Sequence, residues 1–160
     1  MTETLSDLAL QLSVELEKQS LTMATAESCT GGWVSQVLTA VPGSSGWFEG
    51  GIVSYSNAMK HRLLDVSEEL LSTYGAVSQP VAEQMARGVA RKLGVQASIA
   101  ISGIAGPGGG TVDKPVGTVH IAWYRRGKTF SEAFLFTGDR QQVREQSVRV
   151  ALSELIRLLQ

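Results

Sequence analysis

The sequence has a single cysteine, only two histidines and no long uninterrupted apolar segment. One cysteine cannot form an internal disulfide, which excludes the disulfide-braced class of small secreted domains. His61 and His120 are far apart in the chain, and together with Cys29 they provide no recognisable metal-ligand spacing. We therefore expect no metal site. Because no segment approaches the apolar length of a bilayer span, we expect no membrane anchor either.

The chain also lacks an excess of charge of either sign, since 14 basic and 15 acidic side chains leave a net charge of -1. No global field therefore holds it on nucleic acid or on an anionic membrane, and an anionic ligand must be bound by a local site. Residues 1–19 alternate acidic and apolar side chains and lack the basic start and apolar run of a signal peptide. We expect a soluble cytoplasmic protein with no nucleic-acid or membrane partner.

The hydrophobic content of the chain suffices for one core, because 43% of the 160 residues are hydrophobic. Residue spacing and turn signals predict an alternation of helices and strands that ends in a hairpin. We therefore expect a single-domain α/β fold over 1–160, a three-layer α/β/α sandwich on a mixed, mostly parallel sheet. The predicted helices span about 4–19, 33–41, 57–64, 67–74, 80–93 and 139–159, and the predicted strands span about 21–25, 51–55, 95–102, 116–124 and 128–136.

The segment TAESCTGG, residues 25–32, falls on a predicted strand-to-helix turn and contains a carboxylate, hydroxyls and a thiol. A serine hydroxyl becomes a competent nucleophile when a lysine held neutral by burial accepts its proton, so Ser28 and Lys60 form one candidate pair. Tyr55, five residues before Lys60, is a candidate to relay a proton or bind a carbonyl. On spacing alone, a capping Ser28, an exposed Lys60 and a core Tyr55 are the more common outcome.

Two neighbours of Ser28 leave alternatives open. Cys29 is the stronger intrinsic nucleophile if the helix N-terminus lowers its pKa, but a lone cysteine beside a strand is more often a small buried hydrophobe. Glu27 is suited to pair with Lys60, to orient a water or to cap the next helix, and the sequence does not choose among these roles.

The second chemical feature is the glycine-rich segment 103–110 together with two arginines. Consecutive backbone N–H groups in such a loop can hold a phosphate, although a wide flexible turn is an equally good interpretation. Arg140 and Arg144 lie one turn apart at the start of the last predicted helix, where cations oppose the helix dipole. Either they bind an external anion, or Asp139 caps a solvated helix face.

Five stretches in the same order together resemble the CinA C-terminal domain family, most closely its stand-alone bacterial form. They are TAESCTGG, PGSSGWFEGGIVSYSN with Lys60, GAVSQPVAEQMA, ISGIAGPGGGTVDKPVGTV and TGDRQQVR. The resemblance implies a nicotinamide-nucleotide amidase, which hydrolyses the carboxamide of nicotinamide mononucleotide to nicotinic acid mononucleotide and ammonia in pyridine nucleotide salvage. It also implies a homodimer. We expect no cofactor. A catalytically inactive, nucleotide-binding paralogue is the alternative.

The resemblance places the family's nucleophile on Ser28 and its supporting residues on Tyr55 and Lys60. In that mechanism, the N–H groups of Cys29 and Thr30 stabilise the oxyanion. Ser44 and Ser45 are expected to line the pocket. The residues expected to bind the phosphate are Gly103, Ile104, Ala105, Gly106, Arg140 and Arg144.

Overall fold

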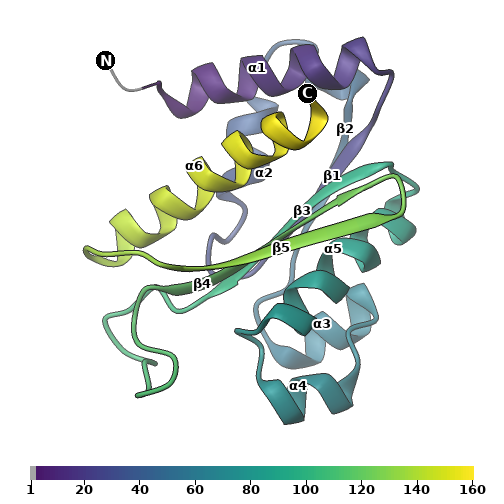
Figure 1. Cartoon of the computed structure of the whole chain (residues 1–160). Coiled ribbons are helices and arrows are strands. Elements are labelled where there is room, and N and C mark those ends of the chain that lie inside the picture. Colours follow the sequence, from purple (N-terminus) through teal and green to yellow (C-terminus); the bar gives the residue numbers. More distant parts are fainter. Residues whose placement is uncertain (1–2) are drawn as a thin grey trace.

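A five-stranded sheet in the order β2-β1-β3-β4-β5 forms the centre of the molecule in a computed structural model that describes residues 3–160 (Figure 1). β1 pairs in parallel with β2 and β3, whereas β4 is antiparallel to both β3 and β5, so only β4 runs against the others. The mixed, mostly parallel sheet expected from the sequence is confirmed. The strands span Met23–Glu27 (β1), Phe48–Val53 (β2), Ala97–Gly103 (β3), Thr118–Arg125 (β4) and Lys128–Leu135 (β5).

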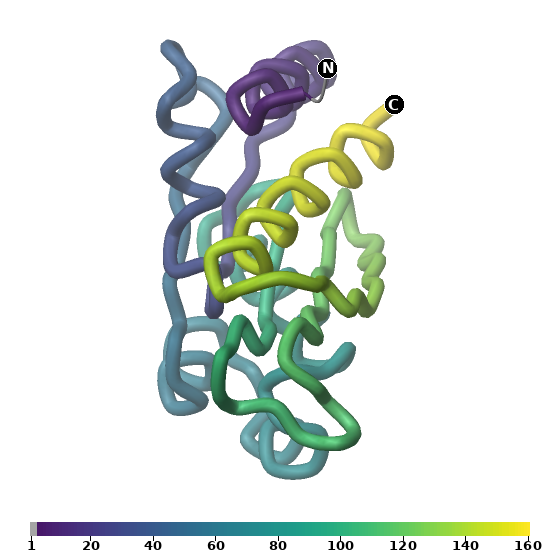
Figure 2. The backbone as a smooth tube through the Cα atoms, turned by 90° about the vertical axis from the view of Figure 1, so that its left-hand side faces the viewer, coloured from purple at the N-terminus to yellow at the C-terminus, as the bar shows by residue number. Residues whose placement is uncertain are grey.

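Helices cover both faces of the sheet, which completes the expected three layers (Figures 1 and 2). On one face lie α1 (Leu5–Lys18), α2 (Trp33–Thr39) and α6 (Arg140–Leu159), and on the other lie α3 (Asn57–Leu64), α4 (Glu68–Tyr74) and α5 (Gln79–Leu93). A 3-10 turn, Ser44–Gly46, precedes β2. No helix within residues 3–160 has the length and apolar character that crossing a bilayer requires.

The strand sequences explain why the two faces differ. Side chains alternate across a strand, so the larger Met23 and Ile99 face α1 and α6, while Ala24 and Ala100 face α5. The face lined with alanine lets α5 pack close to β1, β3 and β4. This layer then supports α3, the helix that bears Lys60.

Most predicted boundaries agree with the structure to within a few residues, because local caps define them. Thr4 and Asp139 each form a reciprocal capping box, and Ser56 accepts a hydrogen bond from the Met59 amide at the start of α3. The prediction of 51–55 for β2 was wrong by three residues at its start and by two at its end, since pairing with β1 runs from Phe48 to Val53. Tyr55 consequently lies two residues beyond the strand and is 61% exposed, so it is not a core aromatic.

One glycine permits the close approach of α3 and α5. A Cβ atom added to Gly88 would lie 2.0 Å from the carbonyl oxygen of Leu64, a backbone atom that cannot move without shifting α3. Lys60 lies one helical turn before Leu64. The position of Lys60 therefore depends on a glycine in the neighbouring helix.

We expect Gly88→Ala to lower the free energy of unfolding by about 1–3 kcal/mol, because the added methyl group forces two backbones apart. Alanine favours a helix over glycine by about 1 kcal/mol, so intrinsic propensity acts in the opposite direction. Urea denaturation measures the change. Gly46→Ala, where the new Cβ meets nothing within 4 Å, is the matched control and should be nearly neutral. A Gly88→Ala protein as stable as wild type would contradict the close contact.

Candidate active site

A cavity of about 270 Å³ opens at the carboxyl ends of β1 and β3 and beside the segment that follows β2. This is the edge at which a sheet with parallel strands usually binds its ligands. Five separate parts of the chain contribute to it: the turn after β1, the segment from β2 into α3, the α4–α5 connection, the glycine-rich loop after β3, and the start of α6. The lining residues are Ser28, Cys29, Tyr55, Lys60, Ala76, Val77, Ser102, Gly103, Ile104, Ala105, Gly106, Gly108, Gly109 and Arg140.

Glu27 organises the turn that presents Ser28. Its buried carboxylate accepts hydrogen bonds from the amides of Val34 and Ser35, at 3.0 and 2.9 Å, and from the Thr30 hydroxyl at 2.7 Å. These amides belong to the first turn of α2, which has no side-chain cap of its own at Gly32. Of the three roles left open by the sequence, the structure selects helix capping.

Lys60 is buried, with 1% of its surface exposed, and its amine lies beside Ser28. Its Nζ atom is 3.0 Å from Ser28 Oγ, 2.9 Å from the Ser54 carbonyl oxygen and 3.3 Å from the Tyr55 carbonyl oxygen. Within residues 3–160, no carboxylate forms an ion pair with this amine. Burial therefore lowers the pKa of the Lys60 amine below its usual value of 10.5.

The Lys60 amine donates to three oxygen atoms, those of the Ser28 hydroxyl and of the Ser54 and Tyr55 carbonyls. In the neutral form, which burial favours, two N–H groups remain for the carbonyls and the lone pair is free to accept the Ser28 hydroxyl proton. The predicted pair of a serine and a buried lysine is thus brought together from two segments 32 residues apart. The arrangement can remove a proton from Ser28 without a histidine or a metal.

Cys29 lines the same cavity, but burial makes its thiol a poorer nucleophile instead of a better one. The residue is 5% exposed, and burial raises the pKa of its thiol to about 11. The thiolate is the nucleophilic form, and it is scarce at neutral pH when the pKa is so high. This favours Ser28 over Cys29 as the nucleophile.

The amides of Cys29 and Thr30 are also available in this turn. Neither N–H donates to another group in the part of the chain that the structure describes. The next amide, that of Gly31, donates instead to the Ser28 carbonyl at 3.0 Å. The two unpaired donors immediately follow the candidate nucleophile, which is the arrangement of an oxyanion-binding site.

Arg140 and Tyr55 meet at the opposite rim of the cavity. Arg140 donates to the Gly106 carbonyl at 2.7 Å and to the Tyr55 hydroxyl at 3.1 Å. The Tyr55 hydroxyl is therefore held by the arginine, and only the Tyr55 backbone carbonyl is bonded to Lys60. This places a cation above the glycine-rich loop, as expected for anion binding.

The glycine-rich loop contributes backbone amides to this rim. Of the described residues, none accepts a hydrogen bond from the N–H of Ala105, Gly106, Gly108 or Gly109. Ile104 differs, because its N–H is bonded to the Thr118 carbonyl at 2.9 Å, and Gly103 lies opposite Val119 in the β3–β4 ladder. Gly103 and Ile104 thus line the cavity as the end of a strand, and the free donors begin at Ala105.

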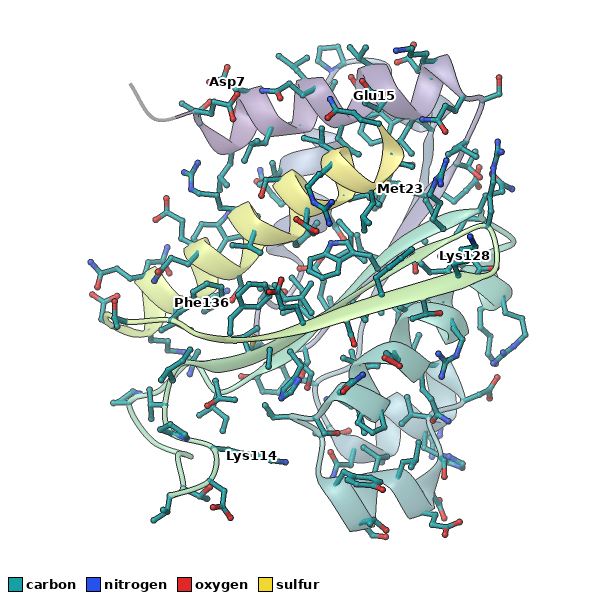
Figure 3. All side chains as sticks on the ribbon, viewed as in Figure 1. Asp7, Glu15, Met23, Lys114, Lys128 and Phe136 are labelled. Carbon is teal, nitrogen blue, oxygen red and sulfur yellow. The ribbon has the colours of Figure 1, made fainter. Side chains whose placement is uncertain are left out.

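The far end of the same loop is anchored away from the cavity. Figure 3 shows Lys114 extending sideways from this loop, and its amine donates to the carbonyl of Tyr74 at the end of α4. Ser102 on β3 donates to the Ala76 carbonyl at 2.8 Å, which joins the α4–α5 connection to the sheet. Sequence reasoning did not identify Ala76, Val77 or Ser102 as lining residues. The only signal was the position of Ser102 at the end of a predicted strand.

Four predicted site residues, Thr30, Ser44, Ser45 and Arg144, do not line the cavity within one chain, and of these Thr30 is fully buried. Ser44 and Ser45 lie before β2, at the amino end of the sheet, whereas the cavity lies at the carboxyl end. Arg144 is directed at the outside of the Ser28 turn, where it donates to the carbonyls of Cys29 and Thr30. Arg144 therefore does not line the cavity, unlike Arg140.

The described residues contain no group of three His, Cys, Asp or Glu side chains close enough to share a metal ion. The polar groups that the cavity does present are the Ser28 hydroxyl, the Lys60 amine and the Arg140 guanidinium.

Comparison with known proteins identifies the family. A sequence model of the CinA C-terminal domain matches residues 5–159. The chain belongs to the CinA C-terminal domain family. It is 48% identical to the nicotinamide-nucleotide amidohydrolase PncC of Pseudomonas putida over 98% of each chain, and 46% identical to PncC of Escherichia coli K12 over 94% of this chain and 92% of that one.

Members of the CinA C-terminal domain family also occur within longer proteins and in solved structures. The CinA-like protein of Desulfotalea psychrophila is 51% identical over 90% of this chain, which spans 35% of that protein. A crystal structure of a CinA superfamily protein from Enterobacter cloacae matches with a TM-score of 0.96 at 39% identity, over 100% of this chain and 95% of that one. The structure of CihA from Agrobacterium tumefaciens matches over the full length of both chains, with a TM-score of 0.94. The sandwich is thus the family fold.

The buried amine predicts how stability depends on pH. Because the pKa of Lys60 is lower in the folded chain than in the unfolded chain, the unfolded chain binds more protons between the two values, and the free energy of unfolding rises with pH across that window. Lys60→Met removes this contribution. In urea denaturation series, we expect the free energy of unfolding of wild type to rise relative to that of Lys60→Met as pH increases from 7 toward 10.5. Lys18→Met, at an exposed position, should show no such trend, and a parallel result for both variants would contradict a depressed pKa.

Proposed function

We propose that this protein is a nicotinamide-nucleotide amidase that hydrolyses the carboxamide of nicotinamide mononucleotide to nicotinic acid mononucleotide and ammonia. The observation on which the proposal rests is the 3.0 Å contact between the buried Lys60 amine and the Ser28 hydroxyl. The name and near full-length identity of the Pseudomonas putida relative support the substrate. The reaction would serve pyridine nucleotide salvage.

In the proposed first step, Ser28 Oγ attacks the carboxamide carbon while its proton passes to the neutral Lys60 amine. The carbonyl oxygen becomes an oxyanion that the N–H groups of Cys29 and Thr30 bind. The carbon–nitrogen bond then breaks, and Lys60 returns its proton to the leaving nitrogen, which departs as ammonia. A water molecule, deprotonated in turn by Lys60, releases the carboxylate product and restores Ser28.

The mononucleotide phosphate fits the other rim of the cavity. Arg140 supplies a cation there, and the free amides of Ala105, Gly106, Gly108 and Gly109 supply neutral donors. A nearly neutral protein can select an anionic nucleotide by such a local arrangement. Tyr55 lies between the two halves, since its hydroxyl is bonded to Arg140 and its carbonyl to Lys60. Its expected role in supporting catalysis stays a prediction.

The first test is ammonia release by the purified protein from nicotinamide mononucleotide. We expect Ser28→Ala to lower kcat by at least about 10³-fold, because the covalent route is lost, and Lys60→Met by about 10²–10⁴-fold, because the general base is lost. Ser153→Ala, at an exposed serine of α6, is the matched control. Binding of the nucleotide without ammonia release by wild type would favour the inactive paralogue, and near-normal turnover in Ser28→Ala would contradict the nucleophile.

Arg140→Ala should raise KM for nicotinamide mononucleotide about tenfold or more with little change in kcat, because a phosphate contact is the same in the ground and transition states. The same variant should leave the activity on nicotinamide riboside, which lacks the phosphate, nearly unchanged. Arg87→Ala, at an exposed position of α5, is the control. Equal losses on both substrates would remove Arg140 from the phosphate site.

The homodimer and the absence of a nucleic-acid partner stay predictions. Sedimentation of the purified protein measures the first, and a titration with an oligonucleotide measures the second.

A further inference from the structure

Arg144 on α6 has no place in the phosphate site, yet almost all of its guanidinium is engaged. Its Nε donates to the Cys29 carbonyl at 3.0 Å and its NH2 group to the Thr30 carbonyl at 3.2 Å. The Cζ atom of its guanidinium also lies 5.4 Å from the centre of the Trp33 ring. These contacts connect the last helix with a turn 114 residues earlier in the chain. They all lie on the turn that follows the candidate nucleophile.

The first of these bonds acts directly on the peptide group that carries the Thr30 N–H. The Cys29 carbonyl and the Thr30 N–H belong to the same peptide group, so a cation bonded to that oxygen makes the Thr30 N–H a stronger donor. The bond from Arg144 to the Thr30 carbonyl acts through one further hydrogen bond. The Thr30 carbonyl shares a peptide group with the Gly31 N–H, which donates to the Ser28 carbonyl at 3.0 Å.

The Ser28 carbonyl in turn shares its peptide group with the Cys29 N–H. Both unpaired donors are therefore connected to the Arg144 guanidinium through hydrogen-bonded peptide groups. One peptide group lies between Arg144 and the Thr30 N–H, and two lie between Arg144 and the Cys29 N–H. Hydrogen bonds in such chains strengthen one another, and a cation at the start orients both dipoles toward a developing negative charge.

We propose that Arg144 is a positioning residue for the oxyanion-binding site: it holds and polarises the peptide groups whose N–H donors, those of Cys29 and Thr30, receive the oxyanion. The proposal rests on the proposed amidase function and adds a residue that acts from outside the cavity. Glu27 holds the same turn from the buried side through the Thr30 hydroxyl and the amides of α2. Arg144 contacts two backbone carbonyls, the Trp33 ring and the Gln141 side chain, none of which Glu27 holds, so the two residues have separable effects.

The kinetic test compares Arg144→Met, which keeps the bulk but removes every donor, with Arg144→Lys, which keeps one cationic donor group. We expect Arg144→Met to lower kcat for nicotinamide mononucleotide by about 10- to 100-fold, less than the loss of a direct oxyanion donor, with KM within about threefold of wild type. Arg144→Lys should recover part of the loss. Arg157→Met, at an exposed arginine of the same helix, is the matched control. A raised KM with normal kcat would instead make Arg144 a substrate-binding residue and overturn the proposal.

A binding test separates this proposal from the proposed function. Pyridine-3-boronic acid forms a bond from boron to a serine oxygen, and the resulting tetrahedral anion places an oxygen in the oxyanion-binding site. We expect Arg144→Met to weaken binding of this probe about as much as it lowers kcat, and to leave the affinity for nicotinic acid mononucleotide within about threefold. Ser28→Ala, which cannot form the bond, sets the level of non-covalent binding.

The two proposals can then fail independently. If wild type releases no ammonia but binds the boronic acid more tightly than Arg144→Met does, the amidase assignment fails and the role of Arg144 stands. If Arg144→Met binds the boronic acid as tightly as wild type, or loses affinity for the boronic acid and the mononucleotide equally, Arg144 does not act through the oxyanion-binding amides. Circular dichroism and urea denaturation of each variant confirm that the compared proteins are folded.

Discussion

The burial of the Lys60 amine without a partner carboxylate is the constraint on which the site depends. Taking a charged amine out of water is costly, and here only neutral oxygen atoms surround it. The low-energy solution is an amine that loses its proton readily, which is what a general base for a serine requires. The carbonyls of Ser54 and Tyr55 are available for this purpose because β2 and its pairing with β1 end at Val53, immediately before these two residues.

The turn after β1 satisfies its backbone groups in a selective way. On the buried side, the Glu27 carboxylate accepts from the first turn of α2, and on the outer side Arg144 donates to two carbonyls. The amides of Cys29 and Thr30, the first two residues after Ser28, are left without partners among the described residues. Buried backbone donors are rarely left unpaired, so these two are best understood as sites for a ligand oxygen.

Much of this could be predicted from residues near one another in the chain. Capping residues such as Thr4 and Asp139, helical apolar spacing and the Arg125–Gly127 turn placed most elements to within a few residues. The predicted proximity of Ser28 and Lys60 is present, and the resemblance in sequence motifs to the CinA C-terminal domain family is confirmed. By contrast, the start of β2 depends on pairing with β1, the positions of Ser44 and Ser45 depend on strand direction, and the orientation of Arg144 depends on how α6 crosses the sheet.

The sequence by itself determined the order of helices and strands and the family, because each follows from local spacing, caps and short motifs. The single core expected from the sequence is in the structure two hydrophobic clusters, one on each face of the sheet. Only the tertiary structure decided which of several plausible polar residues acts where: Glu27 as a cap, Cys29 as a buried thiol, Arg140 at the cavity and Arg144 behind the turn. The physical reason is that burial and hydrogen-bond partners come from segments distant in the chain. A side chain's pKa and direction are properties of that assembled environment, which spacing along the sequence does not encode.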